Sequence, residues 1–270
     1  MTRGALDTAP GPIAAPLFCR RSGTGPPVVL VHGGLPARLT WARQGALADD
    51  WTLIVPSRRG FSPSPAAPRQ DFLADADDLA EIIAEVPGGV HLAGFSYGGL
   101  GACIAAGRLP GQVRSLTLIE VPLWTAAEED ESVRGLAALA DRFAASADDA
   151  QATRDFLALA GVDRKLLAAE DDDVRQATEL ARKLRSPREA KPRFDRIAEA
   201  GVPTLVVSGD HHHGMEQLCD AVAARLAAQR GRLRGMGHAV QRAPGFNPML
   251  EAFLAAAERR RSYGEATNER

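Results

Sequence analysis

The chain has 270 residues, enough to bury a substantial core without disulfides, and this length fits one large domain with an insertion. Its 32 basic and 34 acidic residues leave a net charge of -2, which excludes a general attraction to nucleic acid or to an anionic membrane and favours a small-molecule substrate. The three cysteines, Cys19, Cys103 and Cys219, are widely spaced and odd in number. They predict neither a disulfide framework nor a metal knuckle, and they favour a reducing compartment.

The first 16 residues contain Asp7 and three prolines but no continuous apolar run, so we expect no signal peptide. No window of the sequence has the length and apolarity of a membrane span. We therefore expect a cytoplasmic protein with no membrane or nucleic-acid partner, and the sequence indicates nothing about the oligomeric state.

Short apolar runs alternate with helical patterns in the order expected for parallel strands joined by crossover helices. In chain order, we predict strands at 28–32 and 52–56, a helix at 71–86, strands at 89–93, 115–120 and 203–208, and helices at 215–229 and 246–260. The strands are almost continuous hydrophobic runs, which is typical of a sheet covered on both faces. The pattern predicts an α/β fold with a mostly parallel central sheet flanked by helices.

The interval 122–192 interrupts this alternation, because it is rich in Ala, Asp, Glu and Arg at helical spacing and contains no convincing strand. At roughly 70 residues it is far longer than one crossover requires. We predict an inserted helical cap at 122–192, a core formed by 1–121 and 193–262, and a disordered polar tail at 263–270.

One serine lies in a pattern typical of a nucleophile. The sequence Gly94-Phe95-Ser96-Tyr97-Gly98 follows the predicted strand 89–93 and precedes a helix-compatible sequence. In a G-x-S-x-G elbow the serine stands at a sharp, strained turn, and the two glycines let the strand end and the helix start approach closely. We expect the Ser96 hydroxyl to point out of this turn.

From about residue 16 to residue 260 the chain resembles the α/β-hydrolase fold family, because several motifs occur in the family's order. They are His32-Gly33-Gly34, Arg58-Arg59-Gly60-Phe61-Ser62, the Ser96 elbow, a cap, a late strand at 203–210 and Gly235-Met236-Gly237-His238. The resemblance implies that Ser96 is activated by His238, which occupies the family's Gly-x-Gly-His position. His32 and His91 are expected to have structural roles.

Two residues are candidates for the acid that orients His238. Many relatives carry an Asp three residues after the glycine that ends the late strand, but three residues after Gly209 this chain has His212. Glu120 ends the strand that follows the elbow helix, a position that supplies the acid in a subset of the family that includes many haloalkane dehalogenases. We favour Glu120, and Asp210 is the alternative.

The resemblance also implies an oxyanion hole, in which backbone N–H groups face the charge that develops on the attacked carbonyl. Tyr97 follows the nucleophile and is expected to supply one N–H. The second is expected from the loop after the first strong strand, with Gly34 as our choice and Leu35 as the next.

These residues predict a cofactor-independent serine hydrolase acting on a carboxylic ester, thioester or lactone. The serine at the elbow argues against dehalogenase and epoxide hydrolase chemistry, which use an aspartate there in this family. Hydrolysis of an amide or of a carbon–carbon bond stays open, since the same residues support both. A non-catalytic ligand-binding protein on this scaffold is the alternative from another class.

The triplet His211-His212-His213 suggests a metal site, but consecutive residues point in different directions and no acidic or cysteine partner lies at ligand spacing. We therefore predict a loop of solvated histidines and no metal.

Overall fold

The computed structural model describes residues 16–145 and 172–268. Within them, one sheet contains strands in the order β1-β3-β2-β4-β5-β6-β7. β1 pairs antiparallel with β3, and the other neighbouring strands are parallel. The strands are β1 (Cys19–Ser22), β2 (Pro27–Val31), β3 (Thr52–Pro56), β4 (Val90–Phe95), β5 (Val113–Ile119), β6 (Thr204–Ser208) and β7 (Gln229–Arg232). The predicted mostly parallel α/β sheet is confirmed.

Side chains alternate between the two faces of the sheet, and both faces are buried. Val29 and Val31 of β2 belong to one hydrophobic cluster, whereas Val28 and Leu30 belong to another on the opposite face. Successive side chains of a strand point to opposite faces, so a strand covered on both sides must be apolar at every position. This explains the continuous hydrophobic runs of the sequence.

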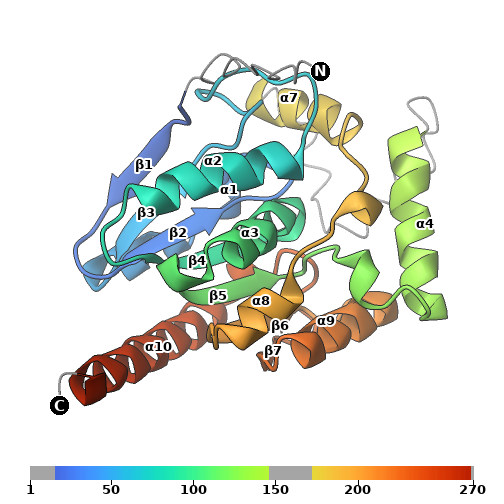
Figure 1. Ribbon diagram of the computed structural model, residues 1–270. Coiled ribbons are helices and arrows are strands. Elements are labelled where there is room, and N and C mark those ends of the chain that lie inside the picture. The colour runs from blue at the N-terminus through green and yellow to red at the C-terminus, as the bar shows by residue number, and fades with distance from the viewer. Residues whose placement is uncertain (1–15, 146–171, 269–270) are drawn as a thin grey trace, which may run out of the picture.

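Helices cover both faces (Figure 1). One cluster contains residues of α2 (Phe72–Ala84), α3 (Ser96–Arg108), α4 (Glu131–Ala145), α8 (Phe194–Glu199), α9 (His213–Arg225) and the 3-10 turn η3 (Trp124–Ala126). The opposite cluster contains residues of α1 (Ala37–Thr40), α10 (Phe246–Asn268) and the 3-10 turns η1 (Gln44–Asp49) and η5 (Val240–Arg242). The remaining described elements are α7 (Asp172–Ala181), η2 (Pro110–Gln112) and η4 (Pro187–Glu189).

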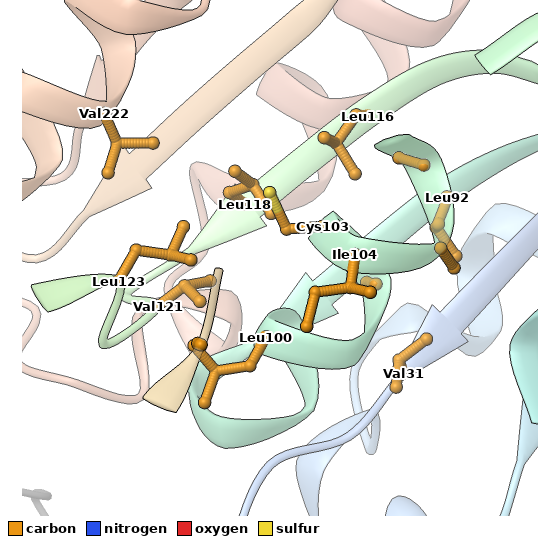
Figure 2. Close-up of a cluster of buried hydrophobic side chains, with 14 of the residues drawn as sticks. Val31, Leu92, Leu100, Cys103, Ile104, Leu116, Leu118, Val121, Leu123 and Val222 are labelled. Atoms are coloured by element: carbon orange, nitrogen blue, oxygen red, sulfur yellow. The ribbon is translucent and has the colours of Figure 1, made fainter. Parts of the chain in front are cut away.

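The packing of α3 fixes where the candidate nucleophile lies. Figure 2 shows Cys103 and Ile104 of α3 among Leu116 and Leu118 of β5 and Leu92 of β4, and all five are buried. Contacts of this kind hold α3 against the centre of the sheet. Its first residue therefore lies at the carboxyl end of β4, the edge where functional groups gather in parallel sheets.

The five predicted strands match β2 to β6 within two residues at either end, but both edge strands were missed. β7 has the sequence Gln-Arg-Gly-Arg, which lacks the hydrophobic run of a central strand, and the predicted helix 215–229 includes its first residue. The structure ends that helix, α9, at Arg225. β1 is also polar and largely exposed.

Two expectations concern regions outside the core. The described parts of 122–192 contain α4, α7, η3 and η4, while 146–171 lie outside the described residues, as does the segment 1–15 in which we expected no signal peptide. The disordered tail at 263–270 stays a prediction, and the last described helix, α10, ends at Asn268. None of the described helices combines the length and apolarity needed to cross a membrane.

Candidate active site

The turn between β4 and α3 has the geometry expected of an elbow. β4 ends at Phe95, Ser96 begins α3, and its φ of 50° lies in the left-handed region that a non-glycine residue rarely adopts. A Cβ added to Gly98 would lie 2.0 Å from the His32 carbonyl oxygen, and one added to Gly94 would lie 2.6 Å from the Cα of Gly99. Only glycine fits at these two positions, so the sequence permits the sharp turn that presents Ser96.

Three of the predicted residues form a chain of contacts. The Oγ atom of Ser96 lies 3.0 Å from Nε2 of His238, and Nδ1 of the same ring lies 3.3 Å from Oε2 of Glu120. Ser96 follows β4, Glu120 follows β5 and His238 lies in the loop after β7, so three strand ends supply them. Glu120 is fully buried and His238 is 13% exposed. This arrangement can transfer a proton from the serine hydroxyl to the imidazole.

Glu120 is held in place by its backbone and by two further groups. Its φ is 51°, and its Oε1 accepts a hydrogen bond of 2.6 Å from the Gly209 N–H. Nδ1 of His211 lies 3.6 Å from the same oxygen. Burial raises the pKa of the Glu120 carboxyl, but the contacts with His211 and His238 outweigh burial and bring that pKa to about 2. The carboxylate is therefore charged at neutral pH and can stabilise a charged imidazole.

Asp210, the alternative acid, lies elsewhere. Its residue is exposed, and its backbone N–H donates to Oε1 of Glu216 at 3.1 Å. Among the hydrogen bonds and ion pairs of the described residues, none joins its carboxylate to His238. The structure brings Glu120, and not Asp210, to the imidazole.

The predicted oxyanion loop is fixed by a buried network of hydrogen bonds that the sequence motifs do not reveal. Nδ1 of His32 lies 2.7 Å from the Leu35 carbonyl oxygen, and its Nε2 accepts from the Arg58 N–H at 2.9 Å. Burial, helped by the charge of Arg58, lowers the pKa of His32 to about 3, so the ring is neutral with its proton on Nδ1. This confirms the structural role expected for His32.

Arg58 extends this network. Its Nη1 donates to the Gly33 carbonyl at 2.8 Å, and its guanidinium pairs with Asp75 of α2, also at 2.8 Å, with both side chains almost fully buried. The Gly33 carbonyl is therefore turned towards Arg58, and in a trans peptide the N–H of Gly34 points the opposite way. The Arg-Arg-Gly motif was the available signal, but it does not reveal this contact.

A cavity of about 470 Å³ opens over Ser96 and His238, a size typical of small-molecule sites. Gly34 and Tyr97, the two expected oxyanion donors, both line it. Tyr97 is the second residue of α3, where backbone N–H groups have no partner within the helix. Most of the remaining described lining is apolar and comes from the segment 122–192 and α9, including Trp124, Leu136, Phe143, Leu184 and Met215.

The expectation of three solvated histidines is wrong for two of them. His211 is 14% exposed and lines the cavity beside Glu120. Nδ1 of His212 accepts from the Gly214 N–H at 3.1 Å, so His212 is the N-cap residue of α9, a position where Asp is common. His213 is exposed. The triplet gives three different environments because adjacent residues leave a turn in different directions.

A metal ion also has potential ligands here. Glu120, His211 and His238 each offer one atom, and these atoms lie within 4.8 Å of one another. Histidine and carboxylate groups are ligands that zinc accepts. Glu120 and His238, however, already contact each other in the series that leads to Ser96, and a metal ion bound between them would displace that contact.

The chain matches the family described as alpha/beta hydrolase fold over residues 26–241 and belongs to that family. It is 29% identical over 232 residues to a pimeloyl-(acyl-carrier protein) methyl ester esterase of Methylococcus capsulatus, covering 80% of this chain and 81% of that protein. A Chromobacterium violaceum protein of the same name is 38% identical over 104 residues, which are 38% of this chain and 40% of that protein.

A solved structure, a bromoperoxidase from Bacillus anthracis, superposes with a TM-score of 0.69 at 18% identity, covering 88% of this chain and 95% of that chain. At this identity the likeness concerns the fold alone.

Proposed function

We propose that the protein hydrolyses carboxylic esters of small molecules through an acyl-enzyme intermediate. In this proposal Ser96 is the nucleophile, His238 is the general base, and Glu120 is the carboxylate that orients His238. The observation that carries the proposal is the unbroken series of contacts from Ser96 Oγ through the His238 ring to Glu120, 3.0 and 3.3 Å long, at the floor of an apolar cavity. A serine hydroxyl needs such a base to be nucleophilic at neutral pH.

In the first step, Ser96 Oγ attacks the ester carbonyl carbon while its proton passes to His238 Nε2. The N–H groups of Gly34 and Tyr97 hold the resulting oxyanion, and Glu120 stabilises the imidazolium. The carbon–oxygen bond to the alcohol then breaks, and the alcohol takes the proton from His238. Water deprotonated by His238 attacks the acyl-enzyme, which releases the acid and restores Ser96. Thioesters and lactones fit the same steps, because each has an activated carbonyl and a leaving group that accepts one proton.

The segment 122–192 acts as a cap in this proposal. Its described residues supply much of the apolar lining, including Trp124 of η3, Leu136 and Phe143 of α4 and Ala177 of α7. A substrate bound between this segment and the sheet edge would have its apolar part removed from water, which strengthens the electrostatic interactions around Ser96.

The names of the relatives support the same reaction class, since both are methyl ester esterases. The names of those enzymes describe a pimeloyl group on an acyl-carrier protein. For this chain we propose only the shared step, cleavage of a carboxylic ester.

Labelling with a fluorophosphonate probe tests the proposal. We expect one label on the Ser96 peptide of the native protein, no label on Ser96→Ala, and turnover of a short-chain aryl ester that disappears in the same variant. A folded native protein that neither takes the label nor cleaves the ester would favour the ligand-binding alternative.

A further inference from the structure

The cavity contains a positive charge that the hydrolytic steps do not use. Arg242 closes η5, four residues after His238, and lines the cavity. Of the described residues that line it, Arg242 alone carries a permanent positive charge. Arg242 lines the same cavity as Ser96, so a substrate bound there lies beside this residue.

The guanidinium of Arg242 lacks a counter-charge within the described chain. One Nη2–H donates to the Leu39 carbonyl of α1 at 2.8 Å, while the Nε–H is buried and has no hydrogen-bond partner among the residues that the structure describes. No carboxylate of the described residues lies within 4.0 Å of it. The two acidic residues of the described lining are engaged elsewhere, Asp141 with Arg188 at 2.7 Å and Glu120 with His238. A partly buried charge without a partner is costly, and a bound anion would remove that cost.

The surroundings divide the cavity into two walls. On the side of Arg242 lie polar groups of Thr40 and Gln241, which also line it. The described wall from 122–192 and α9 is mostly apolar, and its polar members are Asp141, Thr178 and Ser186. Arginine presents N–H donors in a planar fork that matches a carboxylate. A ligand that satisfies both walls has an apolar chain and one carboxylate.

We propose that Arg242 is a carboxylate-binding residue and that the preferred substrates are esters carrying a free carboxylate separated from the ester by an apolar chain, such as half-esters of dicarboxylic acids. This proposal rests on the ester hydrolysis proposed above and names its substrate class. Arg242 has no part in the proton transfers, so its loss should affect how substrates bind rather than how they react.

The test uses two pairs of esters that differ mainly in charge. Monomethyl and dimethyl adipate differ on the acyl side, where the first has a carboxylate and the second a neutral methyl ester. 6-Acetoxyhexanoate and hexyl acetate differ on the alcohol side, where the first has a carboxylate and the second a methyl group. In at least one pair, we expect Arg242→Gln to raise KM for the carboxylate ester about tenfold or more, with kcat and the neutral ester changed less than about twofold. Arg234→Gln is the matched control, because it removes the same charge from an exposed neighbouring position.

Equal effects of Arg242→Gln on the charged and neutral members of both pairs would overturn the proposal, as would no effect on any of them. Failure of the hydrolytic function itself would be recognised separately, as absence of turnover of all four esters. In that case calorimetric titration of Ser96→Ala with the two charged esters decides. Binding that Arg242→Gln abolishes supports the carboxylate site, and binding that it leaves unchanged, or no binding, refutes it.

Discussion

At the scale of single residues, the charge of Glu120 depends on a few precise contacts. Burial alone would favour the neutral acid, but the contacts with the imidazoles of His211 and His238 outweigh burial and bring the pKa of the carboxyl to about 2. The Glu120 carboxyl should therefore not supply the acid limb of a pH–activity profile.

Replacing Glu120 by Gln should lower kcat on the order of 10³–10⁴-fold, because the amide keeps the shape but loses the charge that stabilises the His238 imidazolium. Asp210→Asn is the matched control and should change kcat less than about twofold, since Asp210 is exposed and contacts Glu216 only through its backbone. Turnover of a short-chain aryl ester measures both. A larger loss in the Asp210 variant would assign the acid to Asp210.

Much of the candidate site could be predicted from local patterns, and the remainder depends on distant contacts. Ser96 and His238 lie in short motifs. Position 212, where many relatives carry the acidic residue, is a histidine in this chain, and this favoured Glu120 as the acid. The roles of His211 and Arg58 were not predictable in this way. Each depends on a partner far along the chain, Glu120 for His211 and Gly33 for Arg58, and no local spacing encodes those pairs.

At the scale of elements, the elbow requires β2, β4 and α3 to come unusually close. β2 and β4 are paired neighbours, and the loop after β2 places the His32 carbonyl against the first turn of α3. Glycine at position 98 is therefore needed although it weakens a helix.

Gly98→Ala and Gly135→Ala should have opposite effects on stability. In α3 the new methyl group would lie 2.0 Å from a backbone oxygen, and the resulting overpacking should cost roughly 1–3 kcal/mol, more than the helix gains from alanine. Gly135 lies exposed in α4 with open space around it, so alanine there should stabilise by about 0.5–1 kcal/mol. Urea unfolding measures both changes. Equal stability of the two variants would mean that the close approach at the elbow is absent.

The elements that the sequence did not predict are those whose stability comes from neighbours. β7 is polar, yet it pairs with β6, and Arg230 and Arg232 form ion pairs with Glu216 and Asp220 of α9. Pairing and these charges, rather than hydrophobic burial, place the strand at the edge. The central strands were predictable because burial on both faces leaves a continuous apolar run in the sequence.

At the scale of the whole molecule, the core on the two faces of the sheet contains buried ionisable side chains as well as apolar ones. His32 lies under the oxyanion loop. His91 of β4 has its Nδ1 2.8 Å from the Ser115 hydroxyl, its Nε2 3.1 Å from Oε1 of Glu258 and its ring edge-on to Trp51. Both side chains are fully buried. Burial, aided by nearby arginines, lowers the pKa of each ring to about 3.

These two histidines should make the fold sensitive to mild acid. Between pH 6.5 and about 3 each ring is protonated in the unfolded chain but neutral in the folded one, so the unfolded state binds more protons and stability falls as pH falls. From pH 7 to pH 5, where ordinary carboxyls stay ionised, each should remove about 2 kcal/mol from the free energy of unfolding. His91→Gln, remote from Ser96, should lose its share of this dependence whatever its stability at pH 7. Urea unfolding at pH 7, 6 and 5 measures the slope, and the same slope in variant and native protein would show that His91 is protonated alike in both states.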